Sequence, residues 1–243
     1  MPPLDAVVLA GGLGTRLATT VPHLPKALAP IQGTPFLDIV LHQLLSSKAV
    51  SRIFFALGHK ASHILSFLEQ KKSPIPLIPL LEESPLGTAG ALLHAYPHTV
   101  SDPLLVLNGD SFFDLAVSDF LQFHLDHKSQ ATLAIRYMDD ASRYGSIQCD
   151  AAQRILSFQE KSTLSSAGWI NAGIYLFQRN LLAPHASHAP PLSLEKDLFP
   201  SFIASGISAY PHRGTFIDIG TATSYVQAQD ILKPWTLLCK NVS

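Results

Sequence analysis

The sequence has little charge, few cysteines and no long apolar run. Only 14% of its 243 residues are charged, and 17 Lys and Arg against 18 Asp and Glu give a net charge of −1. A chain without a basic surplus lacks the electrostatic pattern of nucleic-acid-binding proteins and of polybasic membrane anchors. We therefore expect no nucleic-acid and no membrane partner, and an anionic ligand would have to be bound by a few local cations.

The two cysteines, Cys149 and Cys239, provide neither a disulfide framework nor a Cys-x-x-Cys pair. Such sparse use of cysteine suits a reducing compartment. No apolar stretch approaches the roughly 20 residues of a membrane-spanning helix. The first residues, MPPLDAVVLAGG, also lack the charged region and the long apolar region of a secretory signal. The sequence thus predicts a cytoplasmic protein.

Hydrophobic residues make up 47% of the chain, which is enough to bury a large core. Short apolar runs in the first half alternate with segments of helical periodicity. We expect strands at 6–10, 53–57, 77–81 and 104–107, and helices at 36–46, 62–70 and 88–95. This order predicts right-handed crossovers and therefore a Rossmann-like α/β fold, with a doubly wound, mixed but mainly parallel sheet covered by helices on both faces.

The pattern changes near residue 131. Strand-like runs such as ATLAIRYM and WINAGIYLF follow one another with little helix between them. This part of the chain is expected to form an antiparallel, lid-like extension. A helix at 193–205, a strand at 215–219 and a closing helix at 223–232 would complete a single domain that spans residues 1–243.

Polar and glycine-rich segments follow each of the four expected parallel strands. They are, in chain order, AGGLGTR, GHK, EESPLGTAG and NGDSFFD. Ligands of open parallel sheets bind beyond the carboxyl ends of the strands, where the chain order reverses. The sequence therefore predicts a binding site built from these four segments.

The first of these segments, GGLGTR at residues 11–16, differs from the two best-known phosphate-binding loops. No lysine follows its last glycine, which excludes a Walker A loop, and Leu17 replaces the third glycine of a dinucleotide-binding fingerprint. Its glycines still allow backbone N–H groups to approach an anion closely at a strand-to-helix turn. The forked Arg16 and the compact Lys26 would add the positive charge that a polyphosphate requires.

The motifs resemble, in order and over nearly the whole chain, those of the sugar-phosphate nucleotidyltransferases. LAGGLGTRL and PKALAP resemble the family's phosphate-binding signature, PLGTAGAL its base-binding segment and VLNGD its first metal-binding strand end. FQEKS resembles its Glu-Lys pair, NAGIY its sugar-contacting segment and FIDIGTATSY the segment of its second metal-binding aspartate. The resemblance implies an enzyme of GT-A-like nucleotidyltransferase fold that joins a nucleoside triphosphate to a sugar 1-phosphate and releases pyrophosphate.

By this resemblance, residues 1–111 form the nucleotide-binding half of the domain. Arg16, Lys26 and Asp110 are the implied catalytic residues, because in-line transfer to a phosphate requires positioning and charge neutralisation more than covalent help. The implied nucleotide-binding residues are Leu9, Gly11, Gly12, Gly14, Thr15, Glu82, Pro85, Gly87 and Thr88.

The resemblance assigns residues 112–217 to the sugar-phosphate-binding half, and 218–243 to a metal-binding strand end and C-terminal helix. The implied sugar-phosphate-binding residues are Asn108, Gly145, Glu160, Lys161, Asn171 and Gly173. Asp110 and Asp218 both follow apolar strand-like runs, and they would bind Mg²⁺. This ion prefers oxygen ligands and is commonly held by one or two carboxylates together with substrate phosphates.

Glu82 bears on the choice of base, since related thymidylyl and uridylyl enzymes often have glutamine at this position. A carboxylate accepts two hydrogen bonds side by side, which matches the N1–H and N2–H₂ donors of guanine. Uracil or thymine offers one such donor beside acceptors. GTP is therefore the favoured nucleoside triphosphate, unless Glu83 faces the base instead.

Within the family, the pattern is most similar to the D-glycero-α-D-manno-heptose 1-phosphate guanylyltransferases, which implies GDP-heptose for a lipopolysaccharide or capsule. The alternatives are a mannose-1-phosphate guanylyltransferase and a uridylyl- or thymidylyltransferase acting on N-acetylmuramate or glucose 1-phosphate. A non-catalytic nucleotide-sugar sensor is a further alternative, but such a protein would be expected to lose the charged residues that are present here. The sequence leaves open whether the chain forms a homo-oligomer.

Overall fold

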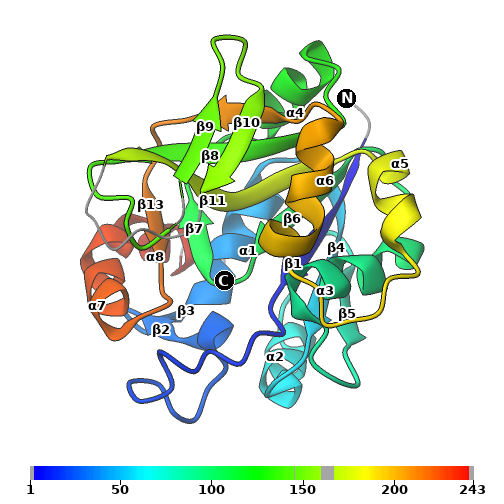
Figure 1. Cartoon of the computed structure of the whole chain (residues 1–243). Coiled ribbons are helices and arrows are strands. Elements are labelled where there is room, and N and C mark those ends of the chain that lie inside the picture. Colours follow the sequence, from blue (N-terminus) through cyan, green and yellow to red (C-terminus); the bar gives the residue numbers. More distant parts are fainter. Residues whose placement is uncertain (1–2, 145, 160–166, 241–243) are drawn as a thin grey trace.

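The computed structural model describes residues 3–144, 146–159 and 167–240. Gly145, Glu160 and Lys161, to which the sequence assigns the sugar phosphate, lie outside the described residues. A nine-stranded mixed sheet forms the centre, and its main path has the order β10-β9-β11-β6-β1-β4-β5. Figure 1 shows this sheet running through the molecule, with helices on both sides.

The parallel part of the sheet corresponds closely to the strands expected in the first half of the chain. Its strands are β1 (Leu4–Leu9), β4 (Val50–Leu57), β5 (Leu77–Leu81) and β6 (Leu104–Asn108). β1 pairs in parallel with β4 on one side and with β6 on the other. All six residues of β1 are buried, as expected for a strand covered on both faces.

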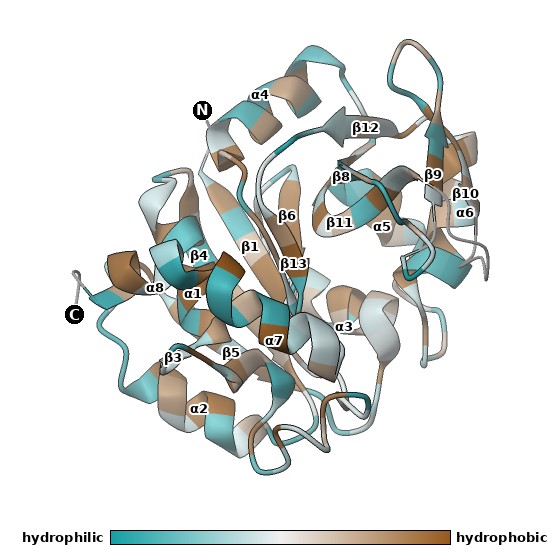
Figure 2. Ribbon diagram, turned by 90° about the vertical axis from the view of Figure 1, so that its left-hand side faces the viewer, coloured by the Kyte–Doolittle hydropathy of each residue, from teal (hydrophilic) through white to brown (hydrophobic). Residues whose placement is uncertain are grey.

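Alternation along β1 supplies two apolar cores, one on each face of the sheet. Ala6 and Val8 pack with residues of α1 (Phe36–Ser46), α4 (Val117–Asp126) and α8 (Lys233–Lys240). Val7 and Leu9 pack with residues of α3 (Gly87–Ala95) and α6 (Phe199–Ala204). In Figure 2 the central strands β1 and β6 are largely brown, whereas the surrounding helices carry both colours. The doubly wound arrangement expected from the sequence is confirmed.

The later strands are mostly antiparallel, as expected, but they do not form a separate lid. They are β8 (Ala131–Met138), β9 (Ser146–Cys149), β10 (Ile155–Gln159) and β11 (Gly168–Phe177). β11 pairs with β6, so these strands continue the central sheet. A further strand, β12 (Ser208–Pro211), pairs with β8 in parallel. The sequence did not predict β12, because its partner strand lies far away along the chain.

Several helices differ from the expected ones. The single helix expected at 193–205 is a π-helical turn, Leu194–Leu198, followed by α6, which begins at Phe199. Pro200 explains this division, because it has no N–H to donate to the preceding turn. The helix α2 (Ala61–Glu69) is shifted by one residue from the expected range. The helices α4, α5 (Arg179–Leu182) and α8 were not predicted.

Two small antiparallel pairs complete the fold beside the main sheet. β2 (Pro30–Ile31) pairs with β3 (Thr34–Pro35), and β7 (Ser111–Phe113) pairs with β13 (Phe216–Asp218). After β13, α7 (Ala222–Ile231) begins with a capping box formed by Thr221 and Ser224. None of the helices in the described ranges is long and apolar enough to cross a membrane.

Candidate active site

A cavity of about 490 Å³ opens at the carboxyl ends of the parallel strands. The polar segments that follow β1, β5 and β6 line it, as the sequence predicted, whereas the fourth predicted segment, GHK after β4, does not. It is lined by all the residues expected to be catalytic or to bind nucleotide, together with Asn108: Leu9, Gly11, Gly12, Gly14, Thr15, Arg16, Lys26, Glu82, Pro85, Gly87, Thr88, Asn108 and Asp110. The structure thus brings these residues together, while their roles stay predictions.

The glycine loop lies so close to its neighbours that larger residues would not fit. A Cβ atom at Gly11 would lie 2.5 Å from Oε1 of Glu82, and one at Gly58 would lie 2.8 Å from the Gly11 carbonyl oxygen. The segment GHK contacts the loop directly, since the His59 N–H donates to the same Gly11 carbonyl at 3.3 Å. Close packing of strand ends therefore requires glycine here.

Arg16 of the loop and Lys26, ten residues later, both approach Gly220, which follows β13. A Cβ atom at Gly220 would lie 3.6 Å from a guanidinium nitrogen of Arg16 and 3.6 Å from Nζ of Lys26. Lys26 is largely buried and forms an ion pair with Asp110. Two cations and a carboxylate thus meet near Gly220 in the lining of the cavity.

Asp110 and Asp218 lie side by side because β7 pairs with β13. Asp218 stands opposite Ser111 in this ladder, and the Ile219 N–H donates to the Asp110 carbonyl at 2.9 Å. In the described part of the chain, no three or more His, Cys, Asp or Glu side chains gather into a metal-binding group. Two carboxylates without soft ligands nevertheless fit Mg²⁺, whose other ligands are commonly water and substrate phosphates.

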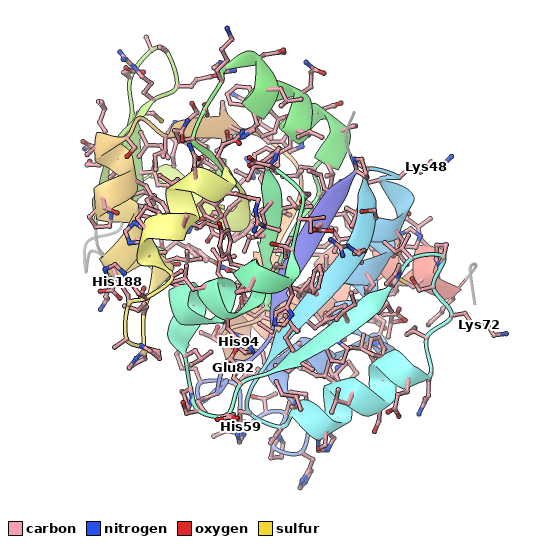
Figure 3. The ribbon with its side chains drawn as sticks, turned by 90° about the vertical axis from the view of Figure 1, so that its right-hand side faces the viewer. Lys48, His59, Lys72, Glu82, His94 and His188 are labelled. Atoms are coloured by element: carbon pink, nitrogen blue, oxygen red, sulfur yellow. The ribbon has the colours of Figure 1, made fainter. Side chains whose placement is uncertain are left out.

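Glu82 also lines the cavity and directly follows β5. Its Oε2 accepts from the Leu86 N–H at 3.3 Å, and its Oε1 is buried without a hydrogen-bond partner among the described residues. Burial raises the pKa of the carboxyl, while the Leu86 N–H and the nearby His94 lower it. Figure 3 shows Glu82 near His94 of α3. The neighbouring Glu83 is exposed and does not line the cavity.

The sequence did not predict that residues 191–194 contact the start of α3. The Leu192 carbonyl accepts from the Ala89 N–H at 2.9 Å, and the Leu194 N–H donates to the Thr88 hydroxyl at 2.9 Å. A Cβ atom at Gly87, whose φ is +74°, would lie 2.3 Å from the Leu192 oxygen. Pro191 of this segment lines the cavity. No local signal marks these residues, because the contacts join segments far apart in the sequence.

Of the described residues expected to bind the sugar, Asn108 lines the cavity, whereas Asn171 and Gly173 do not. The Oδ1 atom of Asn108 is buried without a partner in the described ranges. Asn171 does not line the cavity, since its Nδ2 donates to the Tyr175 hydroxyl at 2.8 Å and its Oδ1 accepts from the Gly173 N–H at 3.0 Å. Asn171 shapes a bulge in β11 at which Gly173, with φ +77°, approaches Ser111 and Asn108.

A family model described as nucleotidyl transferase matches residues 5–233. The chain belongs to the nucleotidyl transferase family. The resemblance drawn from the motifs is thereby confirmed at the level of the family, and with it the nucleotidyltransferase fold.

Two curated relatives of this nucleotidyl transferase have different substrates in their names. A putative mannose-1-phosphate guanyltransferase of Sulfolobus acidocaldarius is 33% identical over 92% of this chain and 62% of its own length. A D-glycero-α-D-manno-heptose 1-phosphate guanylyltransferase of Aneurinibacillus thermoaerophilus is 30% identical over 95% of this chain and 99% of its own. The chain thus spans less than two thirds of the first relative and nearly all of the second.

The solved structure of HddC from Yersinia pseudotuberculosis complexed with GMP-PN is also similar to this nucleotidyl transferase. Its TM-score is 0.82 at 32% identity, and the match covers 95% of this chain and 100% of that one. A relative of the same fold and length has therefore been solved with a guanine nucleotide.

Proposed function

We propose that the protein transfers a guanylyl group from GTP to a sugar 1-phosphate, which gives a GDP-sugar and pyrophosphate. The observation that carries this proposal is the carboxylate of Glu82, which lines the same cavity as Arg16, Lys26 and Asp110. A cavity that combines two cations with a buried hydrogen-bond acceptor suits a nucleoside triphosphate. The guanylyltransferase names of the relatives support the same base.

The hydrogen bonding of Glu82 favours guanine over uracil or thymine. A buried acceptor without a partner costs about 1 to 3 kcal/mol, and Oε1 of Glu82 is such an acceptor within the described chain. The N1–H and N2–H₂ groups of guanine would supply two donors to the ionised carboxylate. A uracil or thymine ring would supply one donor and place an acceptor beside the second oxygen.

The glycine loop and the two cations that line the cavity suit an in-line attack on the α-phosphate. Backbone N–H groups of the glycine loop would bind the triphosphate, and Arg16 would stabilise charge on the departing pyrophosphate. Lys26 would bridge the α-phosphate and the incoming sugar phosphate. It now pairs with Asp110, and binding of the substrate would exchange this carboxylate for phosphate oxygens.

Nucleotidyltransferases of this family generally use a divalent metal. Asp110 and Asp218 would hold Mg²⁺, which neutralises charge on the triphosphate when bound. The adjacent strands β7 and β13 keep the two carboxylates close together.

For the sugar, we propose D-glycero-α-D-manno-heptose 1-phosphate. The support is the relative of that name, because the chain spans 99% of it but only 62% of the relative named for mannose. Mannose 1-phosphate is the second candidate, since the relative named for it is 33% identical to this chain.

Release of pyrophosphate tests the proposal. The protein is incubated with Mg²⁺, each of four nucleoside triphosphates and a panel of sugar 1-phosphates that includes heptose, mannose and glucose. We expect the fastest release with GTP and heptose 1-phosphate. Faster release with UTP or dTTP would refute the role of Glu82, and faster release with mannose 1-phosphate would refute the choice of sugar. No release with any pair would refute the transferase activity.

A further inference from the structure

Both carboxylate oxygens of Asp218 are held by the protein itself. The Gly220 N–H donates to Oδ1 at 2.8 Å, and the Tyr144 hydroxyl donates to Oδ2. A guanidinium nitrogen of Arg143 also lies 3.3 Å from Oδ2. The carboxylate is therefore oriented from two sides, by the loop after β13 and by the segment after β8.

Tyr144 is itself fixed by contacts that do not involve Asp218. Its ring packs edge-on against Phe216 of β13, with ring centroids 5.6 Å apart. The Tyr144 N–H donates to the Ala141 carbonyl at 2.9 Å, which closes a turn. The Arg143 guanidinium lies 5.3 Å from the centre of the Tyr144 ring, on the side of α7. The phenol hydroxyl is thus brought to Asp218 by packing and by the local turn.

The chemistry of this contact suits a carboxylate that binds a cation. A phenol donates a hydrogen bond but leaves the negative charge on the carboxylate. Each carboxylate oxygen has two lone pairs, so Oδ1 of Asp218 can accept from the Gly220 N–H and still offer a lone pair to a metal ion, while Oδ2 accepts from Tyr144 and Arg143. Groups that hydrogen-bond to metal ligands fix the orientation of those ligands.

The side chain that pairs with Asp110 differs from Tyr144, because it also lines the cavity. Asp110 pairs with Lys26, which lines the cavity and which the proposed function assigns to phosphate. Tyr144 does not line the cavity and has no such second task. It is therefore suited to hold its carboxylate in place whether or not substrate is bound.

We propose that Tyr144 is a positioning residue for the divalent cation, which it serves by holding Asp218 beside Asp110 through its hydroxyl. This inference rests on the proposed function, in which these two carboxylates bind the cation. The sequence marked the aspartates, but it assigned no role to Tyr144.

Replacement of Tyr144 by phenylalanine tests the inference, because Tyr144→Phe removes the hydroxyl and keeps the ring that packs against Phe216. Tyr225→Phe is a matched control: it also removes one hydrogen-bonded phenol, whose hydroxyl donates to the Pro30 carbonyl at 2.6 Å. Binding of Mn²⁺ alone to the full chain is measured by electron paramagnetic resonance. Losses of groups that support metal ligands cost about 10- to 100-fold in affinity, so we expect the Mn²⁺ dissociation constant to rise by that factor in Tyr144→Phe only.

A second readout is the Mn²⁺ concentration that gives half of the maximal transfer rate. We expect it to rise by a similar factor in Tyr144→Phe, with turnover restored at saturating Mn²⁺. A turnover defect that Mn²⁺ does not restore would indicate a merely structural role and overturn the inference. Equal Mn²⁺ binding by Tyr144→Phe and the wild type would overturn it as well, while the proposed function would stand. If the wild type binds Mn²⁺ no better than Asp218→Asn, the metal assignment of the proposed function fails, and this inference fails with it.

Discussion

Replacing Glu82 by glutamine should weaken the use of GTP much more than the use of other nucleotides. Glutamine has nearly the same shape but replaces one carboxylate oxygen by an NH₂ group, which would face a donor of guanine. Hydrogen bonds to charged groups contribute about 1.5 to 3 kcal/mol each. Loss of one such bond lowers kcat/KM for GTP by about 10- to 150-fold, since 1.4 kcal/mol corresponds to a factor of ten.

The pH dependence of kcat/KM for GTP provides a second test of whether the Glu82 carboxylate accepts hydrogen bonds from the base. The ionised form is the acceptor, and burial raises the pKa of Glu82 from its ordinary value of 4.5. In the wild type, kcat/KM for GTP should therefore fall as the pH is lowered through this raised pKa. The fall should begin at a higher pH than it would for an exposed glutamate. Glu82→Gln should lose this acid limb, because its amide does not titrate.

Steady-state kinetics with GTP and dTTP measure both effects, with pyrophosphate release as the signal. Glu83→Gln is the matched control, because Glu83 is exposed and does not line the cavity. An unchanged kcat/KM for GTP in Glu82→Gln would refute the reasoning. An equal loss in Glu83→Gln would refute it too, because the effect would then not come from the cavity.

Three further predictions concern other parts of the molecule. Asp110→Asn should abolish turnover while the melting temperature stays near that of the wild type, and retained turnover would contradict the assignment to the metal. His124 is fully buried, and burial lowers its pKa to about 4. Because the unfolded chain binds the proton more tightly, the free energy of unfolding should fall by about 2 kcal/mol from pH 7 to pH 5. Urea unfolding of the wild type and of His124→Gln at the two pH values measures this change. The variant should lack this part of the pH dependence. Asp5→Asn should lower the free energy of unfolding by about 2 kcal/mol, since hydrogen bonds to a charged group are lost. The Asp5 carboxylate accepts from Arg52 at 2.7 and 2.8 Å and from the Val100 N–H at 2.7 Å. Asp5 lies at the start of β1, away from the cavity, so kcat should be unchanged.

The first half of the fold could be predicted because its strands are continuous apolar runs that alternate with helical periodicity. The helix α4 was missed because His124 occupies one position of its apolar stripe, where the ring is buried and bonds to Thr132 at 2.8 Å. β12 was missed because its four residues form a strand only through pairing with β8. Local patterns carry no information about such distant pairing.

The residues that line the cavity could be predicted because the carboxyl ends of parallel strands meet at one edge of the sheet. The contacts of Leu192 with α3 and of Tyr144 with Asp218 could not be predicted, since they join segments far apart in the chain. Asn171 was predicted to contact the sugar, and that role stays a prediction; its amide forms hydrogen bonds within β11, and it does not line the cavity. A motif identifies a residue type at a position, whereas the direction of its side chain depends on the bulge around it.

The most direct test of guanylyl transfer is ³¹P nuclear magnetic resonance of the complete reaction. The protein is mixed with Mg²⁺, GTP and D-glycero-α-D-manno-heptose 1-phosphate, and the phosphorus signals are followed over time. We expect GDP-heptose and pyrophosphate to appear in equal amounts while GTP and the sugar phosphate disappear together. Unchanged substrates, or pyrophosphate together with free GMP, would contradict it.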